Sequence, residues 1–228
     1  MRKWIALILL LIIAAGMVLS LQEIPFGIPE SKIGSYFLKE GVRETGATNI
    51  VTSVVVNYRG FDTLGEVTVL FTAAMGLGAL LSAHKKRNAT EQVEPSSLIV
   101  YTGCRFLFPI ILLAGAYIFI HGHLTPGGGF QGGAIIASAF LLMYLGCRGK
   151  RVKAHLSTTL EGVGGLVFIL LGIAGLIIGH EFLFNFLPKG EPNTLFSAGI
   201  IPVIYIAIGL KVGSELAGII DNMIEESQ

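Results

Sequence analysis

Five ionisable residues lie within or beside stretches that are otherwise apolar: Glu66, Arg105, Glu161, Lys211 and Glu215. A charged side chain inside a bilayer is costly, so such residues usually pair with one another or mark a path for ions or protons. Lys211 and Glu215 are four residues apart and can pair along one helix. Two interpretations stay open: salt bridges that hold a helix bundle in register, or a polar step in an ion path through a water-filled cavity.

A second candidate is the stretch GHLTPGGGFQGGAI, residues 122–135, which contains five glycines within seven positions. A phosphate-binding loop would need a Lys followed by Ser or Thr after the glycines, and Gln-Gly-Gly-Ala stands there instead. Gly129, Gly133 and Ala137 recur every four residues, a spacing that lets two membrane helices approach closely. The pattern therefore favours a tight turn followed by a packing face, with a direct contact to moving ions or water as the alternative.

The same spacing of small residues occurs in two later apolar stretches, at Gly175, Gly179, Gly209, Gly213 and Ala217. His123 stands just before the glycine run and is expected to cap a turn or to form hydrogen bonds at the membrane interface. His121 would point to another side of a helix, so a metal-binding pair is not predicted. Pro126 suits the first turn of the helix that follows.

The composition places these residues in a membrane protein. Of 228 residues, 53% are hydrophobic and 14% are charged, whereas about a quarter of a soluble domain is charged. The formal net charge of +1 gives no reason to expect a nucleic-acid partner. Cys104 and Cys147 lie in apolar stretches without the spacing of a disulfide framework or a cluster site, so both are expected to be packing residues.

Six apolar stretches approach the length needed to cross a bilayer. They are residues 4–20, 66–83, 98–122, 128–147, 160–180 and 195–220. The first could be a secretory signal, because Arg2 and Lys3 precede it, but we expect a transmembrane helix. Helices satisfy their own backbone groups in lipid, so the sequence predicts an all-α polytopic bundle of about six transmembrane helices. Pro109 and Pro202 could kink two of them.

The basic residues predict the orientation of these helices. Nine of them fall on one side of a six-span topology: Arg2, Lys3, Lys85, Lys86, Arg87, Arg148, Lys150, Arg151 and Lys153. The opposite side carries Lys32, Lys39, Arg43, Arg59 and Lys189 over a longer stretch. Both termini are therefore expected to be cytoplasmic. In this topology Arg105 and Glu161 lie in the cytoplasmic half, where they could face each other or the Lys211–Glu215 pair.

The segment before the second apolar stretch, residues 48–58, is expected to be a short amphipathic helix at the outer surface. Its apolar face would consist of Ile50, Val51, Val54, Val55 and Tyr58. Gly60 would end it. Thr63 and Glu66 then have the spacing of a capping box for the second transmembrane helix, which by itself explains a glutamate at that position.

Two stretches resemble a known family. GHLTPGGGFQGGAI, followed by an apolar helix and the basic loop CRGKRVK, resembles the B subunit of Mrp-type sodium/proton antiporters (the MnhB family) over about residues 97–220. TNIVTSVVVNYRGFDTLGE resembles the tail of the large A subunit of the same antiporters over about residues 46–83. The resemblance divides the chain into a two-helix tail-like segment, residues 1–90, and a four-helix MnhB-like domain, residues 91–228.

A tail piece cut free of the large subunit is typical of the Mrp-like modules in archaeal respiratory complexes related to complex I. The fused arrangement resembles the sulfane sulfur reductase more than the hydrogenase. The resemblance implies a non-catalytic subunit of the cell membrane, with other antiporter subunits and a redox arm as partners. It also implies transported Na⁺ or H⁺, no cofactor on this chain, and iron–sulfur clusters on partner subunits. A component of a stand-alone antiporter and a purely structural scaffold are the alternatives.

The family's tail carries a membrane glutamate associated with ion translocation, and Glu66 matches it. The family commonly has an acidic residue before the aromatic–Arg–Gly step, where this chain has Asn57. A cation site at Glu66 would therefore need carboxylates from neighbouring subunits. The candidate ion-path residues are Glu66, Asp62, His123, Arg105, Glu161, Lys211 and Glu215.

Overall fold

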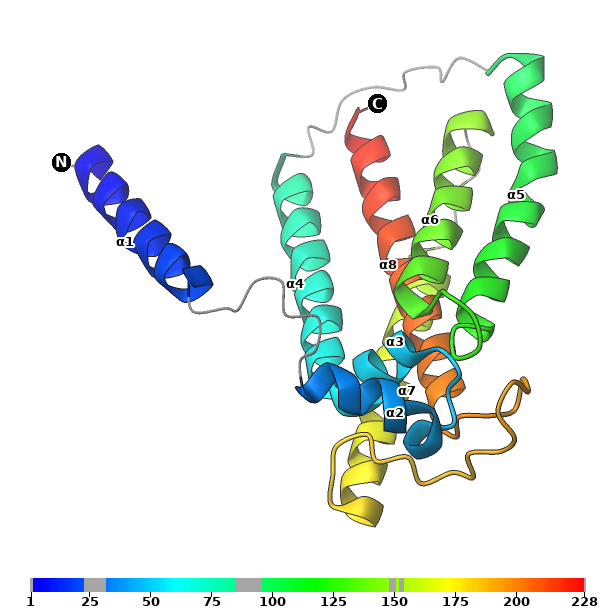
Figure 1. Cartoon of the computed structure of the whole chain (residues 1–228). Coiled ribbons are helices and arrows are strands. Elements are labelled where there is room, and N and C mark those ends of the chain that lie inside the picture. The colour runs from blue at the N-terminus through cyan, green and yellow to red at the C-terminus, as the bar shows by residue number, and fades with distance from the viewer. Residues whose placement is uncertain (1, 23–31, 85–95, 148–150, 152–153, 228) are drawn as a thin grey trace. The chain divides into compact units, whose positions relative to one another are not determined.

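The computed structural model describes residues 2–22, 32–84, 96–147, 151 and 154–227, and these residues form helices and connections without a strand. The helices are α1 (Arg2–Gln22), α2 (Lys32–Thr45), α3 (Ile50–Thr52), the π-helix η1 (Ser53–Tyr58), α4 (Gly60–His84), α5 (Leu98–Ile120), α6 (Gly129–Gly146), α7 (Ala154–Gly179) and α8 (Ile201–Ser227). Figure 1 draws these helices along the chain.

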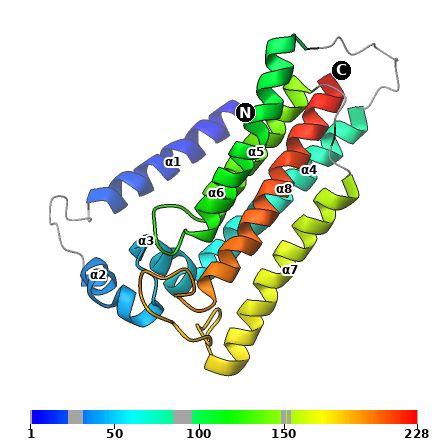
Figure 2. The same ribbon diagram turned by 90° about the vertical axis from the view of Figure 1, so that its right-hand side faces the viewer.

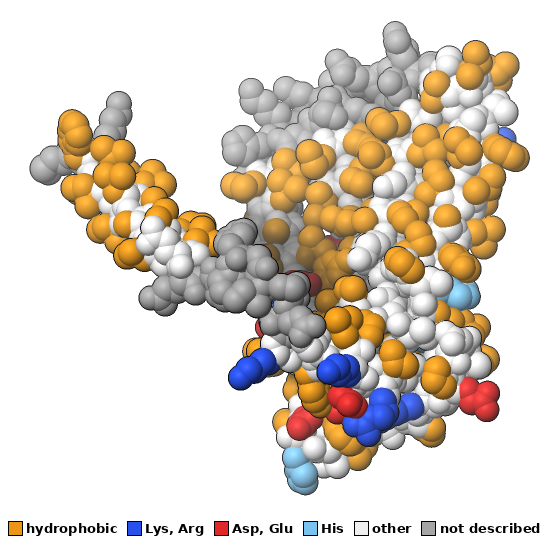
Figure 3. Space-filling view, in the orientation of Figure 1, with side chains coloured by type: hydrophobic (Ala, Val, Ile, Leu, Met, Phe, Trp, Pro, Cys, Tyr) orange, Lys and Arg blue, Asp and Glu red, His pale blue; other side chains and the backbone are white. Residues whose placement is uncertain are grey.

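Six described helices, α1, α4, α5, α6, α7 and α8, are long and apolar enough to cross a membrane. This confirms the predicted all-α polytopic fold. Figure 3 shows hydrophobic side chains along the lengths of the helices, as expected of surfaces that face lipid or other membrane helices. The orientation stays a prediction, because most of the basic residues behind it lie outside the described part of the chain, namely Lys85, Lys86, Arg87, Arg148, Lys150 and Lys153.

The chain divides into two compact units, Met1–Tyr36 and Phe37–Gln228. The first contains α1, and the second contains the C-terminal part of α2 and every later helix. All the candidate site residues lie in the second unit. The division at residues 90 and 91 that the resemblance implies stays a prediction.

Helix α8 is the centre of the second unit. It contacts α4, α5, α6 and α7, and Figures 1 and 2 show it running among them. Its buried side chains include Ile204, Ile208 and Val212, which join Val67 of α4 and Phe168 of α7 in one core. Lipid is as apolar as these side chains, so the contacts stabilise the bundle by close packing rather than by removing apolar surface from water.

Helix α4 begins earlier than expected. Its first residue is Gly60, so Thr63 lies inside the first turn and the predicted capping box is wrong. The Thr63 hydroxyl instead donates to the Val55 carbonyl at 2.7 Å and ties α4 to η1. Asp62 is the acidic residue of the first turn, where it complements the helix dipole. The neighbouring Arg59 also pairs with it, at 2.5 Å.

The segment expected to be one amphipathic helix is a single turn of α-helix, α3, continued by η1. The Arg59 N–H donates to the Val54 carbonyl, the five-residue step of a π-helix. Because a π-helix turns less per residue than an α-helix, the expected apolar face does not become the buried face. The buried side chains are Thr52, Ser53 and Val56 instead, while Val51 is exposed.

Helix α8 begins later than expected, at Ile201, and residues 195–200 belong to the α7–α8 connection. Pro202 therefore sits in the first turn, where it needs no N–H partner, and does not kink the helix interior. Pro109, by contrast, lies inside α5. Asn185 holds the connection together, because its side chain accepts from the Ile200 N–H at 3.0 Å and donates to the Ala198 carbonyl at 3.2 Å.

Candidate functional site

A buried ion pair lies on α8. The Lys211 ammonium donates to Glu215 Oε2 at 2.7 Å, and the two side chains are 8% and 1% exposed. Four residues of helix bring the two charges onto one face. Each charge compensates the other. Removing either one would leave a buried charge without a partner, which costs far more free energy than burying the pair.

Glycines of α7 make room for the lysine. A side chain at Gly164 would lie 3.0 Å from Lys211 Cβ, and one at Gly165 would lie 3.5 Å from Lys211 Cε. The hydrocarbon stem of Lys211 therefore runs along the surface of α7. Its ammonium lies 5.1 Å from the ring centre of Phe71 on α4, a favourable cation–π contact. Three helices thus meet around one charged side chain.

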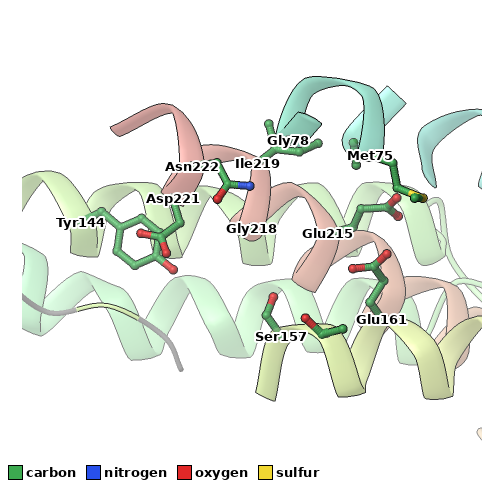
Figure 4. A pocket seen from close by; sticks show the side chains of 12 residues that line it. Met75, Gly78, Tyr144, Ser157, Glu161, Glu215, Gly218, Ile219, Asp221 and Asn222 are labelled. Carbon is green, nitrogen blue, oxygen red and sulfur yellow. The ribbon is translucent and has the colours of Figure 1, made fainter. Parts of the chain in front are cut away.

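Glu215 borders a polar cavity of about 310 Å³ between α4, α6, α7 and α8. The cavity is lined by Ala74, Met75, Gly78, Tyr144, Ser157, Thr158, Glu161, Glu215, Gly218, Ile219, Asp221 and Asn222. Figure 4 shows the carboxylates of Glu161 and Glu215 facing one another across it. The water-accessible space that a polar step would require is therefore present.

A second ion pair lies where the cavity meets the C-terminal part of α8. Asp221 lies 3.0 Å from Arg151, whose guanidinium also lies 5.0 Å from the ring centre of Tyr144. The sequence pattern assigns Arg151 only to the topology and singles out neither Asp221 nor Tyr144. Asp221 is six residues after Glu215, an interval that does not place the two on one helical face, and the contribution of Tyr144 depends on how α6 packs, so no local pattern reveals either residue.

Arg105 is not part of this cluster. It is exposed on α5 and lies above the ring of its neighbour Tyr101 at 5.6 Å. Glu66 and Asp62 are also separate, because both are exposed on α4, while Val67 and Thr63 form its buried face. Glu66 precedes Met75 by nine residues, which is a rise of about 14 Å along the helix. Of the predicted ion-path residues, the structure gathers only Glu161, Lys211 and Glu215.

His123 is fully buried in the connection between α5 and α6, beside the backbone of Thr194 and Leu195. Neither ring nitrogen has a hydrogen-bond partner that meets normal geometry among the described residues. Burial is the main cause that lowers the pKa of His123 below its usual value, against the opposing effect of those backbone groups. The backbone of His123 does anchor the turn, since its carbonyl accepts from the Asn49 N–H at 3.0 Å.

The glycine run packs α6 onto α8. A side chain at Gly129 would lie 2.7 Å from Ile208, and one at Gly133 would lie 2.8 Å from Val212 and 3.0 Å from the Gly209 carbonyl. The helix begins at Gly129, with Gly128 as its N-cap at φ 151°, so Pro126 precedes the helix rather than starting it. The C-terminal glycines of α7 differ, because Gly175 and Gly179 pack against Leu183 and Phe184 of the connection that follows.

Both cysteines are buried, and Cys104 packs α5 onto α6 at Gly146. A side chain at Gly146 would lie 2.5 Å from Cys104 Cβ, and the Cys104 thiol donates to the Tyr101 carbonyl at 3.2 Å. In the described part of the chain, no group of three His, Cys, Asp or Glu residues is placed to hold a metal ion.

Comparison with known proteins finds two family matches. Residues 99–218 match a domain related to the MnhB subunit of Na⁺/H⁺ antiporters, and residues 1–98 match the MbhE family, one of the subunits of MBH. An uncharacterized protein of Methanocaldococcus jannaschii is 36% identical over 212 residues, covering 80% of each chain. The A/B subunit of a probable K⁺/H⁺ antiporter of Rhizobium meliloti is 33% identical over 205 residues, covering 77% of this chain and 20% of the relative.

Two solved structures share the fold. A chain of the archaeal membrane-bound sulfane sulfur reductase is 46% identical, with a TM-score of 0.80 and 97% of both chains covered. A chain of the Mrp complex from Dietzia is 24% identical, with a TM-score of 0.73, covering 97% of this chain and 26% of that one. Because the MnhB match spans more than half of its length, the chain belongs to the MnhB family and carries an MbhE-like segment ahead of its MnhB domain.

Proposed function

We propose that this chain is a membrane subunit of the Mrp-type cation/proton antiporter module of a redox-driven respiratory complex, of the sulfane sulfur reductase type. One observation carries the proposal: the reductase chain and this chain cover 97% of each other at 46% identity. The match extends through both family segments, so the order of the MbhE-like and MnhB segments is also that of the reductase chain. The partners would then be other antiporter subunits and a redox arm in the cell membrane.

In this proposal the chain is non-catalytic, and the iron–sulfur clusters belong to partner subunits. Its two cysteines support this assignment, because both are buried and Cys104 is packed against Gly146 of α6. What the chain supplies for ion movement is a buried ion pair beside a polar cavity. A role in a stand-alone antiporter is the second candidate, favoured by the match to the Rhizobium antiporter.

The first experiment isolates the complex gently in detergent, identifies the co-purifying chains, and assays iron and nickel. Iron without nickel, together with antiporter-type subunits, is the expected result. Iron with nickel would indicate a hydrogenase. The absence of both metals would leave a stand-alone cation/proton antiporter as the function.

Glu66 would act at the contact with a neighbouring subunit, because it is exposed on α4, outside the buried face that Thr63 and Val67 form. In vesicles that contain the assembled complex, Glu66→Gln should reduce sodium-dependent proton movement. Glu40→Gln is the control, since it removes only an exposed pair with Arg43 that contributes little to stability. Full coupling in the assembled Glu66→Gln complex would remove Glu66 from the ion path.

A further inference from the structure

Among the described side chains, the cluster between α4, α7 and α8 carries one more negative than positive charge. Lys211 compensates one of the two carboxylates, Glu161 and Glu215. Asp221 adds nothing to the imbalance, because Arg151 lies 3.0 Å from it. Among the described side chains that line the cavity, α4 contributes only Ala74, Met75 and Gly78, and α6 contributes Tyr144. One carboxylate therefore has no compensating charge within the described cluster.

The structure also shows an atom that a positive ligand would satisfy. Glu215 is 3% exposed overall, and its Oε2 accepts from Lys211. Its other oxygen, Oε1, is buried and has no hydrogen-bond partner in the part of the chain that the structure describes. Glu161 is half-buried across the cavity, and its side chain forms no ion pair or hydrogen bond with the described residues. A buried carboxylate oxygen without a donor is costly, so a cation or a proton at this position would be stabilised.

We propose that Glu161 and Glu215 form a site where an alkali-metal cation and a proton compete for the single uncompensated negative charge. This inference rests on the proposed function, and it assigns a place for the exchange within this chain. Carboxylate, hydroxyl and water oxygens are the ligands that a hard cation prefers, and the cavity offers the first two through Glu161, Glu215 and the hydroxyl of Ser157. Binding of either ligand neutralises the cluster, so the two exclude each other.

Two glycines, Gly78 and Gly218, leave space for an approach to this site. Glu215, Gly218 and Asn222 lie at helical intervals on α8, and Asn222 is seven residues after Glu215, a rise of about 10 Å. A side chain at Gly218 would lie 3.8 Å from the Ser157 hydroxyl, and one at Gly78 of α4 would lie 3.9 Å from the Asn222 amide. The approach therefore runs from the C-terminal end of α8 to the carboxylates, and the volume is enough for several water molecules.

Lys211 determines how strongly the Glu161–Glu215 site binds a cation. Its ammonium already holds Glu215 Oε2, so a bound cation shares that carboxylate with a fixed positive charge. Two uncompensated carboxylates would hold a cation tightly, whereas a transported ion must also leave. The ion pair thus limits the site to one exchangeable charge, and the ring of Phe71, 5.1 Å from the ammonium, adds a cation–π contact that helps to hold Lys211 in place.

The test uses the intact complex and measures binding apart from transport. Infrared difference spectra are recorded for exchange of choline chloride with sodium or potassium chloride. In the wild type the carboxylate bands should change, with a half-saturating salt concentration that rises as the pH falls. Glu161→Gln should raise that concentration by about tenfold or more and flatten its pH dependence, because one of the two anionic ligands is lost. Glu161→Asp should restore part of the affinity.

Glu181→Gln is the matched control, since Glu181 is exposed in the α7–α8 connection and should leave the spectra unchanged. Glu161 is the residue to substitute because Glu215→Gln would also leave Lys211 unpaired and weaken folding. An assembled Glu161→Gln complex with the spectra and affinity of the wild type would overturn the inference. Vesicle transport separates the two proposals: a wild-type complex that binds cations but moves no protons contradicts only the proposed antiport.

Discussion

Thr52 and Gly122 are 70 residues apart in the sequence, and the Thr52 hydroxyl donates to the Gly122 carbonyl at 2.6 Å. The same hydroxyl accepts from Tyr205 of α8 at 3.0 Å. One side chain of α3 therefore joins the turn before the glycine run to the central helix. This contact links the segment that matches MbhE to the segment that matches MnhB.

Thr52→Val should destabilise the protein by about 1–3 kcal/mol, because two buried hydrogen bonds are lost while the shape of the side chain is kept. Thermal unfolding in detergent measures the change. Thr72→Val is the control, since the Thr72 hydroxyl is exposed and bonds only to its own helix. Equal melting temperatures for the two variants would show that the contact at Thr52 contributes nothing.

Gly133→Ala should destabilise the bundle by about 1–3 kcal/mol, because its Cβ would lie 2.8 Å from Val212 and 3.0 Å from a backbone oxygen of α8. Gly76→Ala is a matched control on α4, where no described atom lies within 4 Å of the added carbon. It should be neutral or slightly stabilising, because Ala favours helix. Thermal unfolding of both variants in detergent gives the comparison, and a Gly133→Ala protein as stable as the control would contradict close packing of α6 on α8.

Lys211→Met should cost about 3–5 kcal/mol of stability, because the buried Glu215 then has no compensating charge. The double variant Lys211→Met with Glu215→Gln should recover much of that loss, since no buried charge remains. Unfolding of the wild type, both single variants and the double variant gives the coupling between the two residues. Additive losses in this cycle would mean that the ion pair contributes nothing as a pair.

Stability should fall as the pH drops below about 6.5, the usual pKa of histidine, because His123 has a lowered pKa in the folded state. The unfolded chain then takes up a proton that the folded chain does not, which costs up to about 1.4 kcal/mol per pH unit until the folded pKa is reached. Above pH 6.5 the residue is neutral in both states and has no effect.

The pH dependence is measured as melting temperature between pH 5 and pH 8. His123→Gln should flatten the acid side of this profile relative to the wild type. His121→Gln should keep it, because His121 stacks on Tyr117 at 4.1 Å and is only half-buried. His121 is also the ionisable neighbour whose charge lowers the pKa of His123, so a modest shift is expected in that control.

The sequence predicts the transmembrane helices well because length and hydropathy alone determine them, and the Lys211–Glu215 spacing suffices to suggest a pair. It fails at the ends of elements. The start of α4 depends on the π-helix before it, and the start of α8 depends on the turn that Asn185 holds. No local sequence pattern at either position is strong enough to predict the first residue of the helix.

Glu161 and Arg105 differ in whether they lie on the buried face of their helices. Glu161 shares a helical face with Gly164 and Phe168, both buried against neighbouring helices, so it points into the bundle. Arg105 lies beside Cys104 but off the buried face of α5 that Cys104, Gly115 and Phe119 mark. The position of each residue relative to the buried glycines of its own helix could have predicted that Glu161 is turned inward and Arg105 outward. The cavity itself could not be predicted, because it depends on how α4, α7 and α8 pack together.

The central place of α8 has a consequence for biosynthesis. It follows α4, α5, α6 and α7 in the order of synthesis, yet all four contact it. Until it emerges from the ribosome, the glycine face of α6 and the carboxylate of Glu161 have no partner helix within this chain. Helices α5 and α6 can pack on each other before α8 is made, through contacts such as Cys104 with Gly146, whereas α4 and α7 contact the rest of the bundle mainly through α8. A chain stopped before Ile201 would therefore lack the helix that joins α4 and α7 to the α5–α6 pair.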